Sequence, residues 1–370
     1  MRLHKITNSL IFILLFTVCQ GPFYSLSAQA GWPTQEWERS TPKEQGINPD
    51  HLDQVVKDKT ENSKYEYLHS LIIVKNGYLV FEEYFNSFND EKPNFLQSVT
   101  KSFTSAVIGM AIEQGHIKSV EEKVLDFFPD TLEIENMDDR KKSMILEDIL
   151  TMRTGTDYDE GYNESAHNQL NRLKTGWDIF YLNRPMIREP GTGFQYDSGG
   201  VILLSAMLKN RTGLHVNDYA DKYLFPTMGI KKILWLKNDE GHPHTGGGLI
   251  LLPLDMAKFG LLYLKGGLWE DTQLVPKDWV EQSFTKHHSF GGANSRKTTD
   301  YGYLWWILQG DPDGEGKQSI YAAKGYGGQR IFIIPEHDMI VVTTSNWINP
   351  AGSGDPVDIL YGHILPALHY

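Results

Sequence analysis

The sequence is poor in cysteine, in basic residues and in long hydrophobic runs. Its one cysteine, Cys19, is among the first thirty of 370 residues, so the rest of the chain has no thiol for a nucleophile, a redox pair or a cysteine-based zinc site. A chain without thiols suits an oxidising compartment such as a periplasm. The 35 Lys and Arg against 47 Asp and Glu give a formal charge of −12, which repels phosphate backbones. We therefore expect no nucleic-acid partner.

The first thirty residues have the pattern of a secretory signal peptide. A basic start is followed by an apolar run, and Ala28 and Ala30 supply small residues at the −3 and −1 positions of a cleavage site. The apolar run falls far short of the ~20 residues that span a bilayer, so no stable membrane insertion is expected. A lipid on Cys19 is the less favoured alternative, because Val18 is not the small residue normally found before such a cysteine. We expect cleavage near Ala30 and a periplasmic or extracellular protein.

Hydrophobic periodicity predicts strands near both ends of the chain. Two runs rich in β-branched and aromatic residues flank a turn in which Gly77 can adopt a positive φ, and they predict a β-hairpin. Near the other end, Pro335–Asp338 forms a turn between two similar runs. The predicted strands are His69–Val74, Tyr78–Tyr84, Gly302–Leu308, Ile331–Ile334 and Met339–Thr344.

A helical period dominates the middle of the chain, about residues 119–290. We therefore expect both chain ends to build one antiparallel sheet, flanked by helices, with the middle as an inserted, mostly helical subdomain. This is an α+β fold, and its active site is expected in the cleft between the two parts. The predicted helices are Pro49–Lys59, a long helix from near Ser98 to Gly115, Leu146–Met152, Ile202–Asn210, Pro253–Leu264 and Lys277–Phe284.

A candidate nucleophile stands where a loop enters the long helix. Ser98 and Lys101 are three residues apart, so on a helix they share one face and the amine can reach the hydroxyl. A serine hydroxyl needs a base within about 3 Å to become a good nucleophile. The backbone N–H of Ser98, at the helix N-terminus, can also stabilise an oxyanion. The simpler interpretation is an N-capping serine with a solvated lysine.

Tyr196 is a second candidate, in a loop that precedes an apolar helix. A tyrosine of ordinary pKa, about 10, is a poor base at neutral pH, but the ammonium of Lys101 would favour its phenolate. We therefore expect the pKa of Tyr196 to be lowered and the two side chains to shuttle protons. In the alternative interpretation Tyr196 is a buried aromatic residue and Ser198 caps the helix.

A third candidate is a glycine-rich turn before the predicted strand at 331–334. Gly325, Gly327 and Gly328 let another backbone or a ligand approach closely. A strand edge of this kind can offer a backbone N–H as a second oxyanion donor. The same glycines could instead form only a bulge or a tight turn.

In this order the three segments resemble the S-x-x-K, Y-x-N and K-T-G motifs of the serine β-lactamase and penicillin-binding-protein superfamily. The chain is more narrowly similar, from about residue 70 to 346, to the class C β-lactamase-related branch, which includes esterases and 6-aminohexanoate-dimer hydrolases. The resemblance implies a β-lactamase/transpeptidase-like fold over residues 31–370, without cofactor or metal. It makes Ser98 the nucleophile and Lys101 and Tyr196 the proton-transfer groups. It also implies an oxyanion hole formed by the N–H groups of Ser98 and Tyr326.

Two departures from these motifs bear on the substrate. Ser198 stands where Asn usually closes the second motif, and Ala323-Lys324-Gly325 replaces K-T-G. Both remove contacts typical of penicillin-type substrates and so favour esterases and amino-acid-oligomer amidases. Because Lys324 occupies the middle of its triplet, the motif lysine's carboxylate-binding role is not transferred to it. Gly325 and Ser198 are still expected to border the substrate.

Weaker signals have structural alternatives. His242 and His244 have a metal-like spacing, but no third ligand is identifiable, so no metal site is expected. We expect His244 and Thr245 to border the substrate pocket instead. Trp305 and Trp306 can line a pocket, but such residues more often belong to the core.

The sequence therefore predicts an exported serine hydrolase that cleaves an ester or amide bond of a small or short peptide-like molecule through an acyl-enzyme. One alternative is a β-lactamase or DD-peptidase, which export favours and the two departures disfavour. Another is a catalytically silent binding or sensor protein, which the intact Ser98, Lys101 and Tyr196 disfavour. The sequence has no readable signal for the substrate or the oligomeric state.

Overall fold

The computed structural model describes residues 30–62, 64–161, 163–290, 298–310, 319–347 and 354–368. The predicted signal peptide, with Cys19, lies outside the described residues except for Ala30. Among the helices that the structure describes, none is both long enough and apolar enough to cross a membrane.

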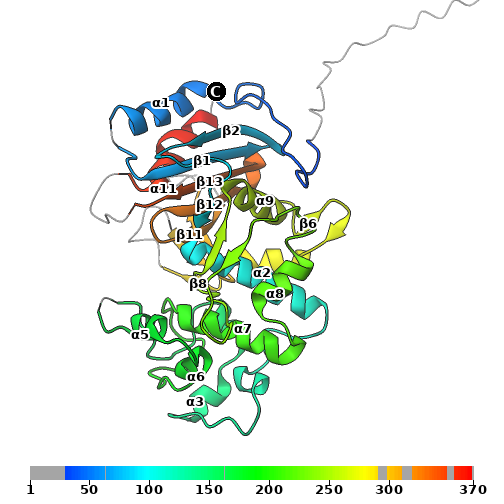
Figure 1. Ribbon diagram of the computed structural model, residues 1–370, viewed down its shortest axis with the longest axis vertical. Coiled ribbons are helices and arrows are strands. Elements are labelled where there is room, and N and C mark those ends of the chain that lie inside the picture. The colour runs from blue at the N-terminus through cyan, green and yellow to red at the C-terminus, as the bar shows by residue number, and fades with distance from the viewer. Residues whose placement is uncertain are drawn as a thin grey trace, which may run out of the picture.

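An antiparallel sheet of eight strands forms the upper part of the molecule in Figure 1. Its strand order is β2-β1-β13-β12-β11-β10-β9-β8, so the front hairpin lies beside the last strand and both ends of the chain share one sheet, as predicted. Leu71 of β1 stands opposite Thr343 of β13. The strands are β1 Leu68–Lys75, β2 Tyr78–Tyr84, β8 His288–Ser289, β9 Thr298–Tyr301, β10 Trp306–Gln309, β11 Ser319–Gly325, β12 Gln329–Ile334 and β13 Met339–Ser345.

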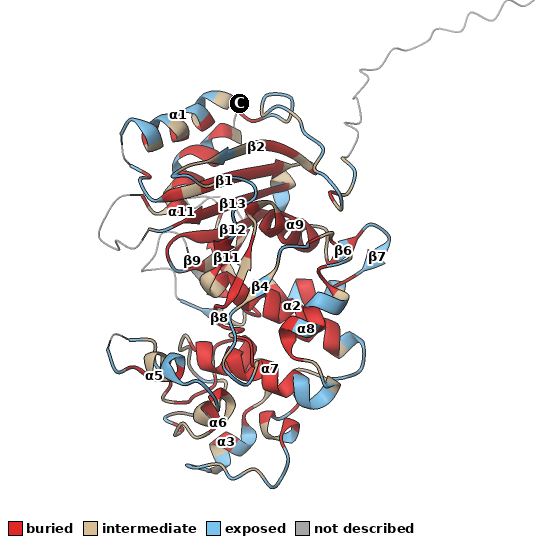
Figure 2. Ribbon diagram, viewed as in Figure 1, coloured by how far each residue is buried: buried red, intermediate tan, exposed pale blue. Residues whose placement is uncertain are grey.

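Helices cover both faces of this sheet. Along β1, Leu71 and Ile73 pack with α1 and the C-terminal helices, whereas Ile72 and Val74 pack with α2 and α9. Side chains of a strand alternate between its faces, so one strand serves two buried layers. Figure 2 shows buried residues running through the sheet, α2 and α7. The covering helices are α1 Pro49–Thr60, α2 Thr100–Glu113, α9 Pro253–Leu264 and α11 Pro356–Ile359.

The lower half of Figure 1 is mostly helical and centres on α7, Ser198–Thr212. Eleven successive residues of α7, from Ser198 to Leu208, are buried, which fits a helix enclosed on all sides. A small sheet in the order β3-β5-β4 lies near the nucleophile turn. The remaining elements are β3 Asn94–Phe95, α3 Asp139–Ser143, α4 Leu146–Leu150, α5 Ala166–Arg172, α6 Trp177–Leu182, α8 Val216–Tyr223, β4 Leu234–Trp235, β5 Leu249–Leu251, β6 Leu268–Trp269, β7 Thr272–Gln273 and α10 Lys277–Ser283.

The structure differs from the predicted elements mainly around the late strands. The strand predicted over Gly302–Leu308 begins only at Trp306, because a turn precedes it: Leu304 has φ 60°, and a side chain on Gly302 would collide with the carbonyl oxygen of Ser283. Strand β11, which carries Lys324 and Gly325, was not predicted. The alternation of apolar and polar residues along β11 is interrupted by small residues, so the sequence gives only a weak strand signal there.

Candidate active site

Ser98 lies in a tight turn that leads into α2. A single 3₁₀ turn, Gln97–Val99, comes directly before Thr100, the first residue of α2. Gln97 has φ 51°, a conformation that costs a residue with a side chain some strain and that is often found at functional sites. The Nζ of Lys101 donates to Ser98 Oγ at 2.9 Å. The three-residue spacing therefore brings the two side chains together across the junction between the 3₁₀ turn and α2.

Lys101 is enclosed by protein, with an exposed fraction of 1%. Its second hydrogen bond goes to the carbonyl oxygen of Gly246 at 2.6 Å. Burial penalises the ammonium form and lowers the pKa of Lys101 to about 8, although the carboxylates of Glu160 and Asp197 act in the opposite direction. At pH 7 about a tenth of the amine is thus neutral and available as a base, and this fraction grows as the pH rises.

Tyr196 lies next to both groups, but its ionisation differs from the prediction. Its hydroxyl shares a hydrogen bond with Ser98, and Lys101 Nζ lies 4.8 Å from the centre of its ring. The pKa of Tyr196 is raised, chiefly by burial and further by the negative charge of Glu160, and the bond from Ser98 offsets this only in part. The expected lowering was wrong because the ammonium faces the ring and burial outweighs it. Tyr196 is a neutral phenol that holds its proton.

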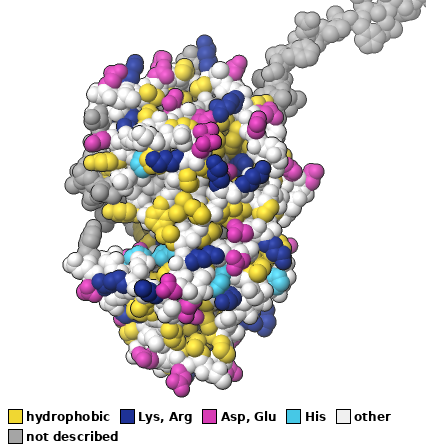
Figure 3. Space-filling model, viewed as in Figure 1, with side chains coloured by type: hydrophobic (Ala, Val, Ile, Leu, Met, Phe, Trp, Pro, Cys, Tyr) yellow, Lys and Arg dark blue, Asp and Glu magenta, His cyan; other side chains and the backbone are white. Residues whose placement is uncertain are grey.

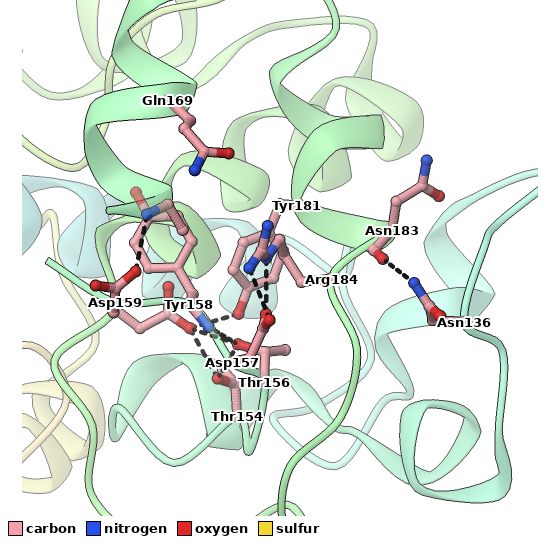
Figure 4. Close-up of polar contacts among 12 residues, drawn as sticks. Asn136, Thr154, Thr156, Asp157, Tyr158, Asp159, Gln169, Tyr181, Asn183 and Arg184 are labelled. Carbon is pink, nitrogen blue, oxygen red and sulfur yellow. Dashed lines mark hydrogen bonds and ion pairs between the residues drawn. The ribbon is translucent and has the colours of Figure 1, made fainter. Parts of the chain in front are cut away.

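A buried carboxylate fixes the loop that carries Tyr196. Asp197 Oδ2 accepts hydrogen bonds from Tyr181 at 2.5 Å and Thr154 at 2.8 Å, and Oδ1 accepts from the N–H of Gly200 at 2.8 Å. Burial raises the pKa of Asp197 to about 6. Figure 4 shows the hydroxyl-bearing side chains of Thr154, Thr156 and Tyr181 gathered in this network. Asp197 therefore fixes the conformation of the chain where α7 begins.

Two glycines allow this network to form. A Cβ on Gly199 would come within 2.6 Å of the rings of Tyr158 and Tyr181, and one on Gly200 within 2.9 Å of the Tyr181 hydroxyl. The Gly-Gly pair after Ser198 is thus required by close packing. Ser198 is the first residue of α7 and caps nothing, since Asp197 is the N-cap.

The glycine-rich turn lies against the nucleophile turn. A Cβ on Gly325 would collide with the carbonyl oxygen of Leu96, two residues before Ser98. The end of β11 therefore abuts the loop that presents Ser98, and Tyr326 follows it with an exposed side chain. Arg330, buried behind this turn, donates from Nη1 to the carbonyl oxygen of Gly325 at 2.5 Å.

The remaining predicted site residues form the wall behind Lys101. Ser198 is buried, and Gly246 lies so close that a Cβ there would come within 3.1 Å of the Ser198 Cβ. His244 is half-buried; its Nε2 lies 3.0 Å from Asn171 Oδ1, and burial, reinforced by Lys101, lowers its pKa to about 3. His244 is thus a neutral member of the wall.

The prediction that Thr245 borders the pocket was wrong. Its side chain is fully buried, and Oγ1 donates to the carbonyl oxygen of Val201 at 2.7 Å. Its own carbonyl oxygen accepts from Thr104 of α2 at 3.0 Å. Thr245 ties α2 to α7 and is unavailable to a substrate.

Aromatic rings line the side of the site next to Tyr196. The Trp306 ring stacks on Tyr196 with centroids 5.8 Å apart, and Phe194 and Phe290 pack around it. Lys324 Nζ lies 4.9 Å from the Trp306 ring centre. Trp305, by contrast, is fully buried. The two neighbouring tryptophans therefore divide between the core and the site.

An apolar surface borders the nucleophile turn on another side. Register in the small sheet places Phe95 and Leu234 on either side of Ile250. Phe95 and Leu234 are 37% and 61% exposed, and Leu236, directly after β4, is 49% exposed. Figure 3 shows hydrophobic side chains gathered across the middle of this face of the molecule. An apolar part of a substrate could rest beside Ser98 here.

Sequence reasoning missed three residues at this site: Glu160, Asp197 and Arg330. Glu160 Oε1 accepts the N–H of Ser198 at 2.6 Å. The only signal for Arg330 was a charged residue at the start of an apolar strand, and Glu160 stands among other acids with nothing to single it out. In the described part of the chain, no group of three His, Cys, Asp or Glu side chains is placed to hold a metal ion.

Comparisons with known proteins agree with this architecture. The family model described as Beta-lactamase matches residues 69–363. The chain is 23% identical over 334 residues to a 6-aminohexanoate-dimer hydrolase of Paenarthrobacter ureafaciens, covering 84% of this chain and 81% of that one. A Bacillus anthracis protein provisionally named 6-aminohexanoate-dimer hydrolase superposes with a TM-score of 0.72 at 20% identity, covering 92% and 89% of the two chains.

A second solved structure extends the likeness to a differently named enzyme. EstCE1, described as a hydrolase with promiscuous acyltransferase activity, superposes with a TM-score of 0.69 at 14% identity and covers 87% of this chain and 99% of its own. At these identities the superpositions establish the fold. Because the family model spans most of the sequence, from the first strand to the C-terminal helices, the chain belongs to the β-lactamase family.

Proposed function

We propose that the protein is a serine hydrolase that cleaves an ester or amide bond through an acyl-enzyme formed on Ser98. The observation that carries this proposal is the 2.9 Å contact between Lys101 Nζ and Ser98 Oγ, in which the amine is buried and has a pKa of about 8. A buried amine of lowered pKa next to a hydroxyl is the arrangement that activates a serine.

The reaction follows from the ionisation of the three side chains. Neutral Lys101 takes the proton of Ser98 as Oγ bonds to the substrate carbonyl carbon, and the carbonyl oxygen becomes an oxyanion held by the N–H groups of Ser98 and Tyr326. The oxyanion collapses, the bond to the leaving group breaks, and the leaving group takes the phenol proton of Tyr196. The proton on Lys101 then restores that phenol. Water repeats the sequence on the acyl-enzyme and releases the acid.

The substrate class rests on the motif departures and on the relatives. Ser198 and the Ala323-Lys324-Gly325 strand replace residues typical of penicillin-binding sites. A relative is named for hydrolysis of 6-aminohexanoate dimers, and a structural neighbour is described as a hydrolase with acyltransferase activity. We propose a small ester, amide or short peptide-like substrate, met in the periplasm or outside the cell after removal of the leader at Ala30.

Mass spectrometry of intact protein tests the proposal. The protein is exposed to p-nitrophenyl butyrate, nitrocefin and an aminohexanoate dimer, and product release is followed in parallel. We expect an acyl adduct on Ser98 with turnover of the ester or the amide, and no adduct in Ser98→Ala. Turnover by Ser98→Ala would contradict the assignment. Turnover of nitrocefin alone would establish a β-lactamase, and no adduct with any compound would favour a silent scaffold.

A further inference from the structure

Glu160 is a charged residue at the active site that the proposed reaction does not use. It lies in the loop between α4 and α5, and its Oε1 accepts the N–H of Ser198, two residues after Tyr196. Its charge acts on the pKa of both Lys101 and Tyr196, the two groups that contact Ser98. The hydrogen bond to Ser198 therefore holds the carboxylate against the loop that carries Tyr196.

Among the described residues Glu160 forms no salt bridge, although its charge acts to raise the pKa of both His167 and Lys101. The acids near it in the sequence are paired: Asp157 with Arg184 at 2.7 Å, and Glu164 with Arg172 at 2.7 Å. The amine of Lys101 is directed to Ser98 and Gly246 instead. A carboxylate accepts up to about four hydrogen bonds, so one from Ser198 leaves most of this capacity unused.

We propose that Glu160 binds a cationic ammonium group on the leaving-group part of the substrate. The inference rests on the proposed function, in which Tyr196 gives its proton to the leaving group, because Glu160 lies on that side. A cation placed beside a half-buried carboxylate without a salt-bridge partner binds more favourably than a neutral group in the same place. The substrates would then be esters or amides of amino-alcohols or diamines.

The aromatic wall supports an organic cation in particular. Tyr301 is fully buried behind this wall, and its pKa is raised chiefly by burial and further by Tyr196 and Glu160. Tyr301 packs edge-on against Trp306 with centroids 4.8 Å apart. Aromatic faces attract ammonium groups and their alkyl substituents. A carboxylate and a wall of rings together suit an alkylammonium better than a metal ion or a neutral alkyl group.

The test compares two thioesters that differ only in charge. Butyrylthiocholine carries the cation, and 3,3-dimethylbutyl thiobutyrate is its neutral isostere. The released thiol is measured with a thiol reagent, to which the chain itself contributes only Cys19. The quantity compared is the ratio of the two kcat/KM values within each protein, so any shift of the Lys101 pKa caused by a mutation cancels. Glu160→Gln retains an oxygen acceptor for the Ser198 N–H while removing the charge.

We expect the wild type to prefer the cationic thioester by up to about fivefold, the upper end of the range for a partly exposed ion pair. Glu160→Gln should bring the ratio close to one, whatever its effect on the absolute rate with the neutral thioester. Asp159→Asn is the matched control, since it removes the same charge one residue away, where the carboxylate accepts the N–H of Ala166; it should keep the wild-type ratio.

Two results would overturn the inference: an unchanged ratio in Glu160→Gln, or a wild type that acylates Ser98 with p-nitrophenyl butyrate but does not prefer the cationic thioester. Failure of every ester to acylate Ser98 would overturn the proposed function itself, and the inference with it.

Discussion

Arg330 holds the carbonyl oxygen of Gly325 with a 2.5 Å hydrogen bond from its buried guanidinium. In a trans peptide the carbonyl and the following N–H point in opposite directions. The N–H of Tyr326 is therefore turned away from Arg330. Gly325 packs against Leu96 on the nucleophile turn, so this orientation favours an oxyanion donor facing Ser98.

Replacing Arg330 with Met should lower kcat by up to about 10²-fold, the effect of losing one oxyanion donor, with little change in KM. Affinity for butylboronic acid, which forms a tetrahedral adduct on serine, is measured together with KM. A protein that is only destabilised would not discriminate between the boronate and the substrate. We expect the boronate to lose affinity in proportion to kcat.

Asp355→Asn provides the control for Arg330. It removes the ion pair at 3.4 Å from Arg330 but retains an oxygen acceptor for the N–H of Val357 at the start of α11. This variant should keep boronate affinity and kcat. If Arg330→Met folds and binds the boronate like the wild type, Arg330 has no part in the oxyanion hole.

The pH dependence of acylation should follow Lys101. Its pKa of about 8 lies below the ordinary value because of burial, so the amine becomes neutral as pH rises through 8. If neutral Lys101 takes the Ser98 proton, kcat/KM should increase about tenfold per pH unit below that value and level off above it. Ester hydrolysis in the presence of Ser98→Ala supplies the background. A flat profile from pH 6 to 9 would show that Lys101 is not the base.

Tyr196→Phe should lower kcat by roughly 10²–10⁴, because the leaving group then receives no proton from the phenol. The raised pKa of Tyr196 means that its proton is present throughout the neutral range, so no second limb should appear near pH 7. Tyr301→Phe removes a hydroxyl from a neighbouring buried ring and should keep most of the activity. Equal losses in the two variants would indicate that packing of the wall, rather than the Tyr196 proton, had been measured.

Asp197→Ala should destabilise the protein by about 2–4 kcal/mol, since it removes a helix N-cap and leaves the buried hydroxyls of Tyr181 and Thr154 without their acceptor. Chemical denaturation measures the free energy of unfolding. Asp197→Asn keeps one oxygen acceptor and should lose less. A loss below 1 kcal/mol in Asp197→Ala would mean that the loop finds other partners.

Local patterns in the sequence were sufficient for the first hairpin, for α9 and for the Ser98–Lys101 pair. In each case the signal lies within a few residues: alternation around Gly77, an apolar period after Pro253, and a three-residue spacing on a helix. The turn before Trp306 was not predictable in this way. It depends on Gly302 packing against Ser283, a contact between separate segments.

The sequence by itself determined the fold class, the family and the two side chains that contact Ser98, Lys101 and Tyr196, because these depend on order and spacing along the chain. The tertiary structure decided the protonation states of those side chains. Burial keeps the proton on Tyr196 and lowers the pKa of Lys101, and the degree of burial depends on every neighbouring segment. Packing of separate segments also brought Glu160 to the N–H of Ser198, 38 residues along the chain, a contact that no local pattern in the sequence indicates.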